Sequence, residues 1–179
     1  EAFGTLAIPL FFLIGVMISG YLIEKRFIHK DKSEKYAPIM GAVAFLLILV
    51  ALGGYYDFFG EFGSQADLSR DFILLACLCG ACGLQNGAIT TASGSTIRTT
   101  HLTGLTTDLG LGIIRSEFKD LSQEQKKEER RANLLRLGTI TSFILGSAIG
   151  AIIFVKFKYI GFLFPASIAL YFTYVAKNN

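Results

Sequence analysis

Long apolar runs separated by short charged segments set the pattern of this chain. At ~1.5 Å of helical rise per residue, about 20 apolar residues cross the ~30 Å hydrocarbon core of a bilayer. Five runs reach or approach that length, and we predict a membrane-spanning helix in each of them: 4–23, 38–56, 72–92, 137–155 and 159–176. A sixth apolar run, 102–114, would rise only about 20 Å as a helix, which is too short to span.

The composition supports an all-α, polytopic membrane protein. The chain has 179 residues, of which 52% are hydrophobic, and its mean hydropathy is +0.51. We therefore predict a single integral membrane domain over 1–179, in contact with membrane lipid. Because residue 1 is Glu and an apolar run follows at once, we also expect the natural start of the protein to lie upstream.

The distribution of lysine and arginine predicts the orientation of the helices. Basic residues are concentrated in the segments 24–37 and 115–136. If 102–114 enters and leaves the membrane on one side, 14 of the 17 basic residues fall on one face, whereas a crossing divides them almost evenly. The positive-inside rule favours the first arrangement. We therefore predict a re-entrant segment and a cytoplasmic C-terminus.

Residues 83–108 are far more polar than a lipid-exposed span tolerates. The stretch holds eight threonines and two serines, besides amide and charged side chains. Such groups persist at membrane depth only when they are buried in protein or face a water-filled cavity. The Ser-Gly-Ser sequence at 93–95 predicts a break in the third helix, because Gly and Ser are poor interior helix formers. A half-helix starting near Thr103 would then direct the positive end of its dipole into the membrane.

The polar groups of this stretch are the predicted binding residues for a solute. They are Gln85, Asn86, Arg98, Thr100, His101, Thr103, Gly104, Thr107 and Asp108. Each has a structural alternative. The amides commonly bond neighbouring helices, hydroxyls commonly bond their own helix backbone, and an Arg98–Asp108 pair would simply fasten the hairpin. His101 titrates near neutral pH, which suits proton coupling, but no relay of further titratable groups accompanies it.

Two spans resemble each other. The segments 4–22 and 138–154 both begin Gly-Thr, contain a central Phe and have small residues four apart, at Gly15/Ser19 and Gly146/Gly150. In the predicted topology they run in opposite directions, as in an inverted repeat. The alternative is that both are glycine-containing helices that pack closely on a neighbour.

The order of motifs along the chain resembles that of a known protein family. The run GLQNGA at 83–88 is followed by IRTTHLTG at 97–104 and then by a half-segment rich in Leu and Gly. These motifs resemble the YoaK-like family of bacterial inner-membrane proteins. The resemblance implies a small inner-membrane protein with no established biochemical role, for which a permease label is sometimes used. It also implies that 4–56 is the remainder of a first unit and that 72–176 is a second unit, with a broken polar hairpin at 93–114.

Other features point away from catalysis and metal binding. Cys77, Cys79 and Cys82 lie in one apolar run without a nearby His or carboxylate, so we interpret them as small buried hydrophobic residues and predict no metal or other cofactor. The chain has no phosphate-binding loop, nucleophile elbow or paired-carboxylate motif, so we predict that it is not an enzyme. Nucleic-acid binding has no support either.

Two peripheral segments also have predicted structures. Ser122 and Gln125 fit a capping box, which predicts a short solvated helix over 120–133 whose basic residues face lipid headgroups. Tyr and Phe residues from 55 to 62 are typical of an aromatic belt at the membrane interface.

Two function classes remain. One is a permease for a small polar or anionic solute, bound at the polar hairpin. The other is a non-catalytic structural or assembly subunit, acting as a homo-oligomer or in a larger membrane complex.

Overall fold

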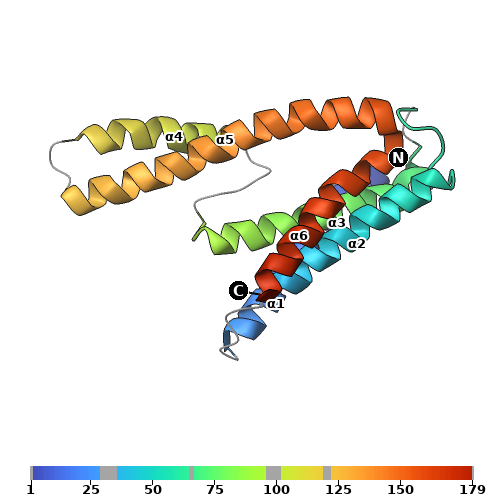
Figure 1. The fold of residues 1–179 in the computed structure, drawn as a ribbon, viewed down its shortest axis with the longest axis horizontal. Coiled ribbons are helices and arrows are strands. Elements are labelled where there is room, and N and C mark those ends of the chain that lie inside the picture. The colour runs from blue at the N-terminus through green and yellow to red at the C-terminus, as the bar shows by residue number, and fades with distance from the viewer. Residues whose placement is uncertain (1, 29–35, 65–66, 96–101, 119–121, 179) are drawn as a thin grey trace. The chain divides into compact units, whose positions relative to one another are not determined.

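All the regular elements in the described part of the chain are helices, which confirms the predicted all-α class. The computed structural model describes residues 2–28, 36–64, 67–95, 102–118 and 122–178 (Figure 1). Its elements are α1 (Ala2–Ile28), α2 (Ala37–Tyr55), α3 (Leu68–Ala92), α4 (Leu102–Glu117), α5 (Gln123–Phe157), the 3₁₀-helix η1 (Lys158–Phe162) and α6 (Leu163–Asn178). Three helical stretches are long and apolar enough to cross a membrane: Ala37–Tyr55, Arg70–Ala92 and Gln123–Asn178. The apolar part of α1, Ile8–Glu24, is shorter.

Two predicted element boundaries differ from the structure. The predicted short helix 120–133 and the predicted span 137–155 are parts of one 35-residue helix, α5. No Gly or Pro lies between Gln125 and Leu137, so nothing in the sequence ends the helix that the capping box begins. The first four residues of the last predicted span, 159–162, belong to the 3₁₀-helix η1, and α6 begins after them.

The helices fall into two compact units. The first unit contains residues 1–88 and 150–179, and the second contains residues 89–149.

Helix α2 lies at the centre of the first unit. It packs along α6 and η1, and α2 and α6 run side by side in Figure 1. Ile39, Val43 and Ala44 of α2 are fully or almost fully buried. They form one apolar cluster with Ile23 of α1, with Ala169 of α6 and with Ala81, Leu84 and Ala88 of α3. This cluster joins α1, α2, α3 and α6.

Helices α1 and α3 approach each other through small residues. A β-carbon placed on Gly15 would lie 2.5 Å from the carbonyl oxygen of Gly80, and one placed on Gly87 would lie 2.9 Å from Cβ of Ser19. Contact at this distance brings the two backbones together without intervening side chains, which is the usual role of small residues between membrane helices. The predicted small pair Gly15/Ser19 is thus a packing surface. Its counterpart Gly146 has no neighbour of this kind within 4 Å.

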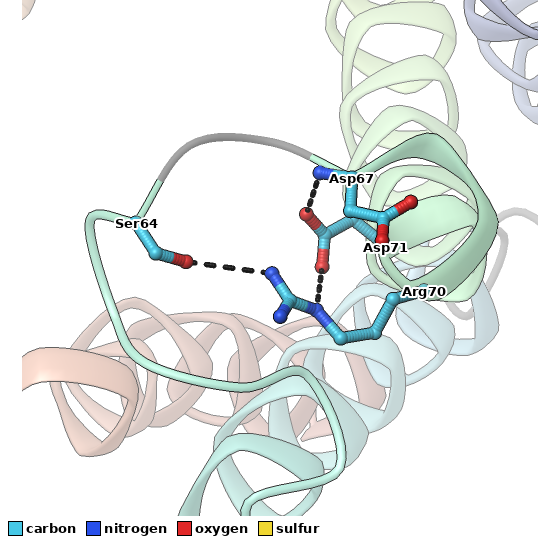
Figure 2. A network of polar contacts seen from close by, with 4 residues as sticks. All are labelled: Ser64, Asp67, Arg70 and Asp71. Atoms are coloured by element: carbon cyan, nitrogen blue, oxygen red, sulfur yellow. Dashed lines mark hydrogen bonds and ion pairs between the residues drawn. The ribbon is translucent and has the colours of Figure 1, made fainter.

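The loop after α2 folds back onto the start of α3. Asp57 adopts a left-handed conformation (φ 57°), and the amide of Phe58 donates to the carbonyl oxygen of Gly53 at 2.8 Å, which ends α2 in a Schellman motif. Further along, Arg70 fastens the loop (Figure 2). Its Nε donates to Asp71 Oδ1 at 3.1 Å and its Nη2 donates to Ser64 Oγ at 3.4 Å.

The aromatic residues of this loop only partly match an exposed belt. Tyr55, Tyr56 and Phe58 are exposed, but Phe59 is 4% exposed and packs with Val50 and Tyr159 in a second apolar cluster. The loop is therefore folded into the first unit rather than spread along its surface.

The second unit is built around α4 and the first turns of α5, which lie alongside each other (Figure 1). The predicted capping box is confirmed at the start of α5. The amide of Ser122 donates to Gln125 Oε1 at 3.0 Å, and the amide of Gln125 donates to Ser122 Oγ at 3.2 Å.

Candidate functional site

The predicted site residues on α3 differ in exposure. Gln85 is exposed, whereas Asn86 is 7% exposed and lies in the interior of the first unit. The next residue, Gly87, packs directly against Ser19 of α1. Asn86 is therefore held on a rigid part of the unit, where the two helix backbones are closest.

The predicted break after α3 is confirmed, and its geometry explains it. The amide of Ser95 donates to the carbonyl oxygen of Thr90 at 2.8 Å, and the amide of Gly94 donates to that of Thr91 at 3.3 Å. This pair of bonds is a Schellman motif, with Gly94 at φ 58° in the left-handed position where glycine is favoured. Helix α3 therefore ends at Ala92 with its last carbonyl groups satisfied.

The predicted half-helix is also confirmed as a helix: α4 begins at Leu102, one residue from the expected start. Four predicted site residues lie on it, and all are exposed: Thr103, Gly104, Thr107 and Asp108. At 3.6 residues per turn, Thr103 and Thr107 share one face and Gly104 and Asp108 share the neighbouring one. The sequence thus places hydroxyls and a carboxylate on adjoining surfaces of one short helix.

The hydroxyl of Thr107 already has a partner. It donates to the carbonyl oxygen of Thr103 at 3.0 Å, and Thr106 bonds that of Leu102 in the same way at 2.9 Å. This is the structural alternative that the sequence left open for the hydroxyls. An acceptor lone pair on each oxygen remains available to a solute.

The carboxylate of Asp108 has no ion-pair partner within the described ranges. Its predicted partners, Arg98 and His101, lie outside the described residues, as does Thr100. Gln85 and Asn86 belong to the first unit and Thr103–Asp108 to the second. The described site residues therefore fall into two groups, one in each unit.

One turn beyond Asp108, α4 carries a polar contact that the sequence pattern does not reveal. Leu105, Gly112 and Ser116 are its buried residues. A β-carbon on Gly112 would collide with Asn133 Oδ1 and would lie 2.5 Å from Glu129 Oε1, both on α5. Glycine at this position is what allows α4 to approach these side chains.

The α5 side of this contact is a three-residue polar cluster. Arg136 Nη1 donates to Glu129 Oε1 at 2.8 Å and to Asn133 Oδ1 at 2.7 Å. The side chains of Arg136 and Glu129 are only 13% and 22% exposed, and Arg136 Nε is buried without a partner in this part of the structure. The sequence could have indicated this cluster, because residues 129, 133 and 136 lie on one helical face. The spacing does not identify α4 as the neighbour of that face.

Helix α4 therefore differs along its length. Its first turns present Thr103, Thr107 and Asp108, and its later turns are closed against α5 by Gly112 and the polar cluster. Such a surface can hydrogen-bond a polar solute and can hold or exchange a cation at the carboxylate. Within the described ranges no three His, Cys, Asp or Glu residues are grouped to hold a metal ion. Cys77 and Cys79 are half-buried and Cys82 is exposed, all as free thiols.

Comparison with known protein families identifies the family of this chain. The family model described as protein of unknown function (DUF1275) matches residues 1–176. The chain belongs to the DUF1275 family. No curated protein and no solved structure matches it. All the predicted site residues lie inside the part of the chain that the DUF1275 model covers. The family description assigns no activity to these residues.

Proposed function

We propose that this DUF1275 protein is a multi-pass permease that carries a small polar solute, with anions as the first class to test. The observation that carries the proposal is the exposed polar side of α4, directly after the interruption of α3. An uncompensated carboxylate and a row of hydroxyls on a 16-residue helix are unsuited to contact with lipid. They suit a water-filled path through the protein.

The direction of α4 supports an anion-attracting role. A helix concentrates about half a positive charge at its first turn, where amide groups lack helical partners. Thr103 and Gly104 belong to that turn, and a β-carbon on Gly104 would meet no other atom within 4 Å. In this proposal the first turn binds the solute, and Asp108, one turn further along, binds a proton or a coupling cation.

The proposal includes a topology in the bacterial inner membrane. The chain re-enters at 93–114, and the C-terminus lies in the cytoplasm. The resemblance to YoaK-like inner-membrane proteins is compatible with this. Single cysteines at Ser93 and Phe118, in a chain with its three native cysteines replaced by Ala, test it with a membrane-impermeant maleimide. Modification of both from the cytoplasmic face is expected, and modification of the two from opposite faces contradicts re-entry.

A thermal-shift screen of the detergent-purified protein tests solute binding. A ligand bound only by the native state raises the melting temperature with its concentration. We expect a shift with one class of small anions or polar metabolites, which is lost in Asp108→Asn and in Asn86→Ala. Glu128→Gln, an exposed change on α5, is the matched control and should keep the full shift. A shift that survives in both site variants contradicts a site on α3 and α4.

A second candidate, an assembly subunit, is favoured by one feature of α5. Gly138, Ser142, Gly146 and Gly150 follow one another at intervals of four, and the first three are exposed. Small residues at this spacing are common where membrane helices associate. If assembly is the function, Gly146→Leu should change the oligomeric state measured by light scattering while leaving the melting temperature of the protomer unaltered. The permease proposal expects no such change.

A further inference from the structure

The first unit contains a pocket whose lining includes none of the predicted site residues. The pocket has a volume of about 440 Å³ and is formed where the loop after α2 meets η1. Its polar lining includes Asp57, Glu61 and Lys158, and its aromatic lining includes Tyr55, Phe62 and Tyr159. This mixture of ring surfaces with a few charged groups is typical of small-molecule sites.

The charged groups of the pocket are not paired with each other or with their surroundings. In the described part of the chain the ion pairs are Arg70–Asp71 and Glu129–Arg136. The carboxylates of Asp57 and Glu61 therefore remain uncompensated, beside a single ammonium group on Lys158. The lining thus carries a net negative charge.

Tyr159 forms the floor of the pocket. It is 9% exposed, and its ring packs edge-on against Phe62, with centroids 5.0 Å apart at 90°. The ring also lies against Gly54 of α2, where a β-carbon would collide with it. Its hydroxyl makes no hydrogen bond to any described residue, so this group is available to a molecule in the pocket.

The pocket is held in shape before any ligand arrives. The guanidinium of Arg70 lies on the backbone of Gly60, where a β-carbon would be 2.6 Å from Nη1. Asp71 holds this guanidinium in turn (Figure 2). Asp57 and Lys158, both in the lining of the pocket, have left-handed backbones, at φ 57° and 49°. A fixed site loses little conformational freedom on binding.

We propose that this pocket binds a small organic ammonium ion. The carboxylates of Asp57 and Glu61 neutralise the cation, and the faces of Tyr55 and Phe62 attract it through their ring quadrupoles. The Tyr159 hydroxyl accepts a hydrogen bond from the ammonium group. The proposal is independent of the permease site, since none of these residues belongs to α4 or to the polar part of α3.

Three probes of nearly equal shape but different charge test the proposal: benzylammonium, benzyl alcohol and benzoate. Ligand-observed NMR titrations with the full chain in nanodiscs measure each dissociation constant at neutral pH. We expect benzylammonium to bind most tightly and benzoate most weakly. Equal binding of all three probes, or preference for benzoate, overturns the proposal.

Two variants give opposite expected shifts. Glu61→Gln should weaken benzylammonium binding about threefold, and Lys158→Gln should tighten it about threefold, the size expected for one exposed ion pair. Glu61 and Lys158 are exposed, so both variants should fold, and their melting temperatures check this. Weaker binding in Lys158→Gln would overturn the proposal, because removal of a positive charge from the lining should strengthen the binding of a cation. Tyr159→Phe keeps the ring and should weaken benzylammonium alone.

Discussion

The carbonyl oxygen of Phe12 lies against Gly83, so closely that no β-carbon fits between them. This contact joins α1 to α3 in the same small-residue surface as Gly15, Ser19 and Gly87. The contact packs α1 directly against α3, the helix that carries Gln85 and Asn86. Side-chain volume at position 83 therefore sets the distance between the two helices.

We predict that Gly83→Ala destabilises the protein by about 1–3 kcal/mol, the usual cost of overpacking. The neighbour that must move is backbone, which cannot rotate away. Thermal unfolding in detergent measures the loss. Gly80→Ala is the control, since its β-carbon meets only Leu46 Cδ1 at 3.8 Å. This control should raise stability slightly, because Ala favours the helix by ~1 kcal/mol over Gly. Equal melting temperatures for the two variants would contradict the packing described.

Gly112→Ala should separate α4 from α5. The added methyl group would collide with Asn133 and crowd Glu129, so α4 must shift or the polar cluster must break. Hydrogen exchange of the α4 amides should become faster in this variant. In Gly110→Ala, whose β-carbon has open space, exchange should be unchanged or slower. Faster exchange in both variants would contradict the prediction. It would mean that the effect does not depend on the contact between Gly112 and α5.

Removal of one partner of the Arg136–Glu129 pair should cost more than removal of both. Glu129→Leu leaves a largely buried guanidinium with one acceptor, for which we expect a loss of roughly 1–3 kcal/mol. The double variant Glu129→Leu/Arg136→Leu removes the uncompensated charge and should recover part of that loss. A double-mutant cycle of unfolding free energies measures the coupling. Strict additivity would exclude a direct interaction between these side chains.

Ser122→Ala should fray the start of α5. The substitution removes the acceptor for the Gln125 amide, and a lost N-cap costs about 1 kcal/mol. We expect faster hydrogen exchange over the first turn of α5 and little change beyond Ala132. Glu128→Ala, on the exposed side of the same helix, should leave the first turn protected.

Arg70→Ala should loosen the loop after α2. Both of its side-chain bonds and its contact with Gly60 disappear together. Hydrogen exchange of residues 58–64 should become faster, and the pocket beside Tyr159 should lose affinity for benzylammonium. Lys156→Ala controls for the loss of a positive charge nearby. An unchanged exchange rate in Arg70→Ala would mean that Schellman closure alone holds the loop.

The helices and their ends could be predicted from local sequence. Gly94 ends α3 because glycine adopts the left-handed position at no steric cost, and Ser122 begins α5 because its hydroxyl reaches an amide three residues on. Both effects involve neighbours within one turn. The start of α4 agrees with the start of the predicted apolar run, at residue 102.

Long-range partners could not be predicted in this way. Gly112 is one of 19 glycines, and nothing in its local sequence indicates that it faces Asn133. The pocket likewise depends on residues about 100 positions apart, such as Asp57 and Lys158. The aromatic neighbours of Phe59 predict an interfacial position for it, but the packing of η1 buries it. The solute-binding role of the residues on α3 and α4 stays a prediction.

The length of α5 has a mechanical consequence. Its 35 residues extend about 52 Å without a glycine, proline or bulge in the first 15, and its charged turns continue directly into its apolar turns. A hinge between these two parts would let them bend independently. Because this stretch has no such break, we expect a displacement of the charged turns to be passed on to the apolar turns that follow them.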